Sequence, residues 1–93
     1  MKILEASFFG YPVTDMARAR KFYEGVIGLK PTKEPTTVPW IEYEIGNATL
    51  GLGAYGDGWK PSADGAMLAL EVDDFEKSVA ELKAAGVPVS VNV

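Results

Sequence analysis

The sequence contains no cysteine and no histidine. Without cysteine there is no disulfide, no thiolate chemistry and no cysteine-rich metal site. Without histidine, the usual general base near neutral pH and the commonest metal ligand are both missing. Carboxylate, tyrosine and lysine side chains are what is left for such roles, so many catalytic and metal-binding classes are disfavoured.

Basic residues are also few, with 9 Lys and Arg against 13 Asp and Glu, a net charge of −4 and a pI near 4.7. This balance argues against a nucleic-acid partner, because phosphates require clustered cations. The one basic cluster, at Arg18, Arg20 and Lys21, is followed by Glu24 and is interpreted as a solvated helix face. No apolar run approaches 18 residues and no signal peptide begins the sequence, so we expect no membrane partner and a cytoplasmic protein.

What is present fits one small folded domain of 93 residues. Hydrophobic residues make up 47% of the chain, and 10 glycines with 6 prolines indicate many turns. Burial of apolar surface is only modestly favourable at this length. We therefore expect a partner to contribute to stability.

One segment occurs twice, at residues 8–15 and 67–74, each time as an apolar strand that runs into an acidic helix start. Each copy is followed by an amphipathic helix, by a glycine (Gly28 or Gly86) and by an apolar pair. The copies keep their spacing over some twenty positions. An internal repeat of this kind indicates two related structural units.

The first unit, residues 1–53, is predicted to be βαβββ. Its helix is capped by Asp15 or Thr14 and ended by Gly28, and Gly46-Asn47 forms a tight hairpin turn. The expected strands are residues 5–13, 29–33, 40–45 and 48–53.

Residues 54–65 are rich in Gly, Pro and Asp and are interpreted as a connection. The second unit, residues 66–93, is predicted to have strand 66–72, a helix capped by Asp73 or Asp74, and strand 87–91. No third and fourth strand is predicted for it, so we expect one domain with an incomplete second unit. Whether this is a short natural form, a truncated descendant or a fragment stays open.

Two stretches carry a resemblance to a known family: PVTDMARARKFYEGVIGL at 12–29 and LEVDDFEKSVAELKAAGV at 70–87. They resemble the vicinal oxygen chelate superfamily, which includes glyoxalase I, extradiol dioxygenases, fosfomycin-modifying enzymes and bleomycin-binding resistance proteins. The resemblance implies an α+β fold of paired βαβββ units. Their strands would curl into a cup-shaped mixed sheet with helices outside, the second unit being truncated to βαβ.

In metal-dependent members of this family, the resemblance places ligands at Phe8, Gly51 and Met67, with a fourth beyond Val93. Divalent metals need several nitrogen or oxygen donors, which a phenyl ring and a glycine do not provide. We therefore expect no metal, no cofactor and no catalytic residue at these positions.

Strand alternation sorts the side chains onto two faces. We expect one set to meet the helices: Phe9, Tyr11, Val13, Leu50, Leu52, Leu68, Leu70 and Val72. The other set would face the cup: Ala6, Phe8, Gly10, Thr49, Gly51, Gly53, Met67, Ala69 and Glu71. The cup floor is therefore predicted to be small and apolar.

Trp40, Glu42 and Glu44 would stand around this floor, with Tyr55 and Trp59 as a lid on the connection. Such a surface suits a flat aromatic or cationic organic ligand. The predicted ligand-binding residues are Phe8, Trp40, Glu42, Gly51, Tyr55, Trp59 and Met67. Two alternatives stay open: the aromatic residues fill the core or a subunit interface, and Glu42 with Glu44 form a solvated face or an acid and base pair.

The incomplete second unit would leave an unpaired strand edge and an apolar face. The family resemblance implies a homodimer or a strand-exchanged oligomer that covers them. The leading functional hypothesis is metal-independent binding of a small aromatic or cationic molecule, as in bleomycin-resistance proteins. The alternatives are a glyoxalase or dioxygenase type of metalloenzyme and a non-catalytic vestigial or interaction module, so whether the chain is an enzyme stays open.

Overall fold

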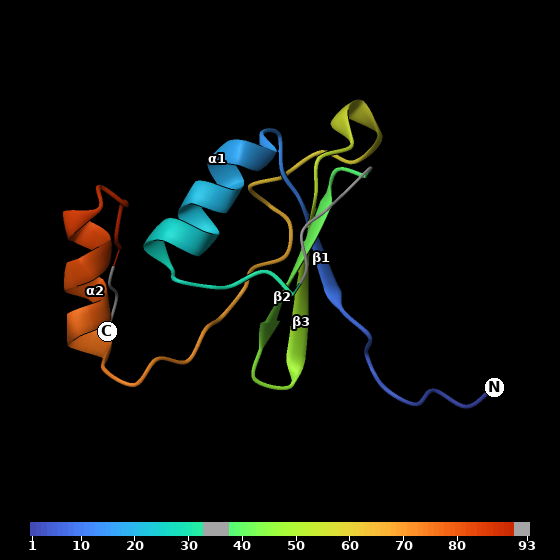
Figure 1. Ribbon diagram of the computed structural model, residues 1–93, viewed down its shortest axis with the longest axis horizontal. Helices are drawn as coiled ribbons and strands as arrows, with labels where there is room; N and C mark the ends of the chain where they lie inside the picture. The colour runs from blue at the N-terminus through green and yellow to red at the C-terminus, as the bar shows by residue number, and fades with distance from the viewer. Residues whose placement is uncertain (33–37, 91–93) are drawn as a thin grey trace.

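The computed structural model describes residues 1–32 and 38–90. Three strands form its sheet: β1 (Phe9–Pro12), β2 (Trp40–Ile45) and β3 (Ala48–Gly53). Their order is β1-β3-β2, with β3 parallel to β1 and antiparallel to β2. Helices α1 (Met16–Arg20) and α2 (Phe75–Ala84) lie on the same side of this mixed sheet, with α2 farther from it (Figure 1). The fold is α+β, as predicted.

The β2–β3 hairpin has the predicted bounds. Apolar and polar residues alternate along β2, and Ile45 pairs with Ala48 across a two-residue turn. Gly46 has a φ of +61°, a conformation that only glycine adopts without strain, and so the turn lies where this residue allows it.

Both helices begin and end at predicted residues. The Asp15 carboxylate accepts a hydrogen bond of 3.0 Å from the Arg18 N–H, and Asp74 caps α2 in the same way. The α1 helix continues into a π-helical turn, Lys21–Val26. Gly28 and Gly86 follow the helices with φ values of +90° and +79°. Asp15 and Asp74 are therefore the caps that the sequence left undecided.

The core lies between α1 and the sheet. Within residues 1–32 and 38–90, four side chains are fully buried: Ile41 and Tyr43 from β2, and Leu50 and Leu52 from β3. Burial of each such side chain contributes about 1.5–3 kcal/mol. Partly buried residues pack against them from β1, the helix and the loops: Tyr11, Val13, Met16, Ala19, Tyr23, Leu29 and Ile45.

A polar network joins the first helix to this core. The Glu24 carboxylate accepts hydrogen bonds from Arg20 Nε at 2.6 Å and from the buried Tyr43 hydroxyl at 2.8 Å. Burial, together with this hydrogen bond, raises the pKa of Tyr43 well above its ordinary value. Arg20 is thus half-buried and paired, so the interpretation of the basic cluster as a wholly solvated face was wrong for this residue.

Several predicted strands are shorter or absent. Only Phe9–Pro12 of residues 5–13 is a strand, and the predicted strand 29–33 is reduced to a single bridge between Pro31 and Tyr43. Residue 33 lies outside the described residues, as does residue 91 of the predicted strand 87–91. Residues 66–72 and 87–90 form no strand.

The physical reason is that alternation creates a face but no hydrogen-bonding partner. With β1 at the edge and residues 66–72 unpaired, the sheet is not closed and no complete cup forms within the described chain. As a consequence, four side chains that were expected to pack against the helices have exposed fractions of 38–56%: Phe9, Leu68, Leu70 and Val72.

No helix in the described part of the chain is long and apolar enough to cross a membrane. The cytoplasmic location stays a prediction from the sequence.

The Glu24 network predicts a stability change in acid. The Arg20 hydrogen bond is the main cause that lowers the pKa of Glu24 below its ordinary value of 4.5, with a smaller contribution from Tyr43. Because the folded-state pKa is the lower one, this contribution is complete above the unfolded-state pKa and is lost as pH falls through the folded-state pKa. We expect the free energy of unfolding in urea to decline below about pH 4.5, and to decline less steeply in Glu24→Gln.

The matched control is Glu44→Gln, which removes an exposed carboxylate from β2. Equal slopes for Glu24→Gln and the wild type between pH 5 and pH 3 would contradict the assignment.

Candidate ligand-binding site

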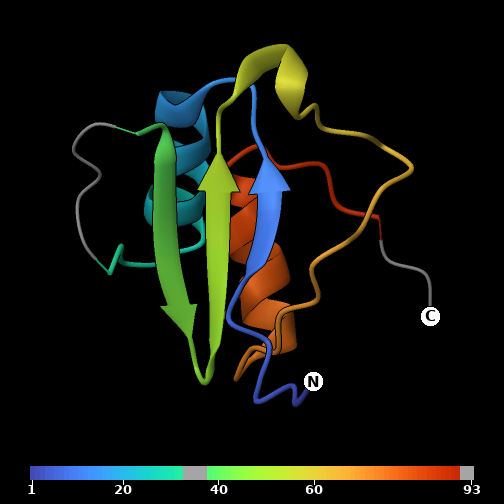
Figure 2. The ribbon, with the colours of Figure 1, turned by 90° about the vertical axis from the view of Figure 1, so that its right-hand side faces the viewer.

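The candidate site is built on the face of the sheet that carries no helix, which is turned toward the viewer in Figure 2. Gly10 of β1 pairs with Gly51 of β3, and Gly53 lies two residues further along β3. These three glycines present bare backbone over two neighbouring strands. We call this surface the glycine face, and the opposite surface the helix face.

Trp40 lies directly against the glycine face. A Cβ atom added at Gly51 would overlap Cζ2 and Cη2 of the Trp40 indole. The ring therefore occupies the space that any larger residue at Gly51 would fill. A glycine inside a strand often marks such a close approach, and here the approaching group is a side chain of the neighbouring strand.

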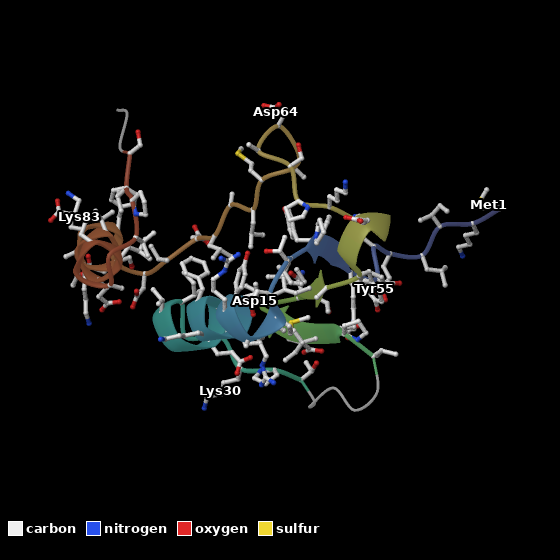
Figure 3. All side chains as sticks on the ribbon, turned by 90° about the horizontal axis from the view of Figure 1, so that it is seen from above. Met1, Asp15, Lys30, Tyr55, Asp64 and Lys83 are labelled. Carbon is white, nitrogen blue, oxygen red and sulfur yellow. The ribbon has the colours of Figure 1, made fainter. Side chains whose placement is uncertain are left out.

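Trp59 and Tyr55 cover the rest of this surface from the connection. A Cβ atom at Gly53 would lie 2.7 Å from Tyr55 Cε2 and 2.9 Å from Trp59 Cζ3, and one at Gly10 would lie 3.0 Å from Trp59 Cη2. Figure 3 shows Tyr55 on the side of the sheet away from α2. The chain turns back toward the sheet through a 3₁₀ turn, Gly56–Gly58.

The aromatic rings contact one another. Trp40 and Trp59 are stacked, with ring centroids 6.4 Å apart and an interplanar angle of 19°. Phe8 meets Trp40 edge to face at 5.3 Å. The Trp40 indole N–H donates a hydrogen bond of 2.9 Å to Glu42 Oε2, which fixes the orientation of the ring. Aromatic pairs of this geometry contribute about 0.5–1.5 kcal/mol beyond their buried area.

The structure thus brings together six of the seven predicted site residues: Phe8, Trp40, Glu42, Gly51, Tyr55 and Trp59. Met67 does not join them. Its side chain is 87% exposed and lines a different hollow beside the free edge of β1. Because residues 66–72 form no strand, nothing holds Met67 over the glycine face.

A hollow of about 290 Å³ adjoins Trp59. It is bounded by Gly10 and Pro12 of β1 and by residues 59–62 of the connection, including Lys60. Sequence reasoning missed Lys60, because no periodicity in the connection indicates which side chains turn toward the sheet.

The residues do not fit the metal of the chelating family members. Phe8 and Gly51 have no donor atom, and the Trp40 ring lies where a ligand side chain at Gly51 would extend. Among residues 1–32 and 38–90, no group of three or more histidine, cysteine or acidic side chains is placed to hold a metal ion. The Glu42 carboxylate is instead a hydrogen-bond acceptor for Trp40.

Chemically, the arrangement offers flat π surfaces, laid over a floor without side chains, and the Glu42 carboxylate. Such surfaces bind planar organic groups by stacking and by exclusion of water. The fold and the site together define a class: an α+β protein whose described sheet comes from one βαββ unit and carries an aromatic cluster on its helix-free face.

Sequence comparison gives the family. The chain belongs to the Glyoxalase/Bleomycin resistance protein/Dioxygenase superfamily, whose family model matches residues 6–92. No curated protein matches the sequence.

Solved structures of similar fold include two from Streptomyces sp. CB03234. The antibiotic binding protein TnmS3 has a TM-score of 0.72 and 26% identity, over 92% of this chain and 74% of its own. A glyoxalase/bleomycin resistance protein has a TM-score of 0.66 and 25% identity, over 85% and 72%. The bleomycin resistance determinant encoded on transposon Tn5 has a TM-score of 0.65, over 97% and 72%, and at 20% identity it shows the fold alone.

Gly51→Ala tests the close approach of Trp40 to the backbone. The added methyl group must displace the indole, and we expect the free energy of unfolding to fall by about 1–3 kcal/mol, as for other overpacked sites. The near-ultraviolet circular dichroism of the tryptophans should change as well. Gly58→Ala is the control, since a Cβ there meets no atom within 4 Å. Unchanged stability and spectrum in Gly51→Ala would contradict the geometry.

Proposed function

We propose that the protein binds a small organic molecule, aromatic or cationic, on the glycine face without a metal. The observation that carries this proposal is the aromatic cluster of Phe8, Trp40, Tyr55 and Trp59 against a floor without side chains. Aromatic faces attract planar rings by stacking and cations by their quadrupole, by about 0.5–2 kcal/mol.

Exposure of this cluster supports binding over simple core filling. Phe8 and Tyr55 are about half exposed, Trp59 is 37% exposed, and the buried core lies on the helix face instead. Large exposed aromatic groups gathered in one place are typical of recognition surfaces. The similarity to TnmS3, an antibiotic binding protein, agrees with a binding role.

The proposal predicts that a planar cation binds through Trp40. With proflavine as the probe, isothermal titration calorimetry should give saturable binding, and Trp40→Ala should weaken it by at least about tenfold, which equals 1.4 kcal/mol. Tryptophan fluorescence should be quenched in the same concentration range.

Two adjacent residues provide a matched comparison, because Phe8 contacts Trp40 whereas Phe9 belongs to the helix face. Phe8→Ala should weaken binding and Phe9→Ala should not. Equal effects, or no binding by the wild type, would refute the proposed site. If native mass spectrometry of the wild type showed one bound divalent ion per chain, that result would instead favour the metalloenzyme alternative.

We further propose that a second copy of the chain covers the free side of the fold, as a homodimer or a strand-exchanged oligomer. The free edge of β1 and the unpaired residues 66–72 both offer backbone groups to a partner strand. Apolar side chains beside them stay exposed: Leu68, Leu70, Val72 and Phe75. A chain of this size is only marginally stable by itself, and burial of this surface against another copy would add to its stability.

This assembly predicts a dimer or larger oligomer at micromolar concentration in native mass spectrometry. Phe75, which is 64% exposed, lies on the apolar side of α2, so Phe75→Glu should shift the protein toward the monomer. Ala80→Glu introduces the same charge at an exposed position of the same helix and should leave the assembly unchanged. A wild type that is monomeric up to 100 µM would contradict the assembly.

A further inference from the structure

We propose that Glu42 and Gly51 are positioning residues that hold Trp40 as the fixed wall of the site, opposite a movable Trp59, so that ligands are selected for a planar ring system and not for positive charge. The inference rests on the proposed binding function and decides between the two ligand classes that it allows.

Trp40 is held from two sides. Its ring lies against the Gly51 backbone, where there is no room for even a methyl group, and its indole N–H is bound to the Glu42 carboxylate at 2.9 Å. A hydrogen bond to a charged acceptor is stronger than one between neutral groups. Both holding residues lie on strands of the sheet, and a site built on strands is more rigid than one built on loops.

Trp59 has no comparable anchor. Among residues 1–32 and 38–90, no side chain accepts a hydrogen bond from its indole, and its backbone N–H reaches only Gly56 within the same connection at 3.2 Å. The ring is 37% exposed and is in contact with the sheet and with Trp40. Loops without such anchors move more easily than strands.

The asymmetry shows how a ligand would enter. A planar molecule that stacks on Trp40 needs a position with its ring centroid about 4.5–7 Å away. Trp59 now holds such a position at 6.4 Å. A ligand must therefore displace Trp59, and the adjoining hollow of about 290 Å³ provides space beside it.

The charges around this position do not favour a cation. One carboxylate oxygen of Glu42 already accepts the hydrogen bond of the Trp40 indole N–H. Lys60 lines the hollow beside Trp59, and its ammonium lies 3.8 Å from Asp57. The Asp57 carboxylate offsets the Lys60 charge, so this pair attracts neither a cation nor an anion into the hollow. The Glu42 carboxylate is engaged by the indole N–H and serves orientation and not ion pairing.

Two substitutions separate these roles. Glu42→Gln keeps an oxygen that accepts the indole hydrogen bond but removes the charge, whereas Glu42→Ala removes both. The probes are riboflavin, which is planar and neutral, proflavine, which is planar and cationic, and choline, which is cationic without a ring. Glu44→Gln and Glu44→Ala are the controls, because Glu44 is an exposed residue of the same strand.

We expect the affinities of the wild type and of Glu42→Gln for riboflavin and proflavine to agree within about threefold. Glu42→Ala should bind both probes at least tenfold more weakly than the wild type does. Choline should not bind. Loss of proflavine affinity in Glu42→Gln with riboflavin unaffected would overturn the inference and leave the binding function intact. No binding of either planar probe by the wild type would overturn both.

A readout without ligand tests the positioning role separately. In the NMR spectrum, the Trp40 indole N–H should exchange slowly with solvent and show a high heteronuclear NOE, and the Trp59 indole N–H should show a lower one. Glu42→Gln should preserve the Trp40 signal and Glu42→Ala should shift it and speed its exchange. Equal mobility of the two indoles in the wild type would overturn the fixed-wall assignment.

Discussion

The close approach of the Trp40 indole to the Gly51 backbone is the constraint on which the proposed site depends. Only a residue without a side chain lets a large ring lie against the central strand. The contact places the ring over the sheet, brings its N–H to Glu42 and presents its edge to Phe8. The contacts that Trp40 makes in the cluster therefore depend on the absence of a side chain at position 51.

The same three strands perform two tasks because their residues alternate. On the helix face, Ile41, Tyr43, Leu50 and Leu52 form the buried core, and Glu24 accepts the hydrogen bond of the buried Tyr43 hydroxyl. On the glycine face, the intervening residues include Trp40, Glu42 and the glycines against which Tyr55 and Trp59 of the connection lie. The rigidity of the core is thus transmitted to the site through the backbone itself, since no side chain of the core reaches the other face.

Sequence patterns predicted these two faces but not everything attached to them. The β2–β3 hairpin and the helix caps follow from local signals: alternation, Gly46, Asp15 and Asp74. The positions of Phe8 and Gly51 came from the family resemblance, and no local pattern predicted how Tyr55 and Trp59 of the connection lie against the sheet. The strands expected at 66–72 and 87–91 were wrong where the structure describes them, because alternation specifies a face and says nothing of a hydrogen-bonding partner. The pairing of Arg20 with Glu24 had a signal in its i, i+4 spacing, but its burial depends on Tyr43, nineteen residues away.

The free edge of the sheet connects assembly with ligand choice. β1 contributes Gly10 to the glycine face, and its outer edge has no partner strand among the residues that the structure describes. A second copy that paired with this edge would extend the floor beyond Gly10, next to the hollow beside Trp59. The fixed wall at Trp40 would be unchanged, because the residues that hold it, Glu42 and Gly51, lie on β2 and β3. Assembly would then determine how large a ring system the site can bind. Selection for a planar ring would depend on Trp40 within each chain.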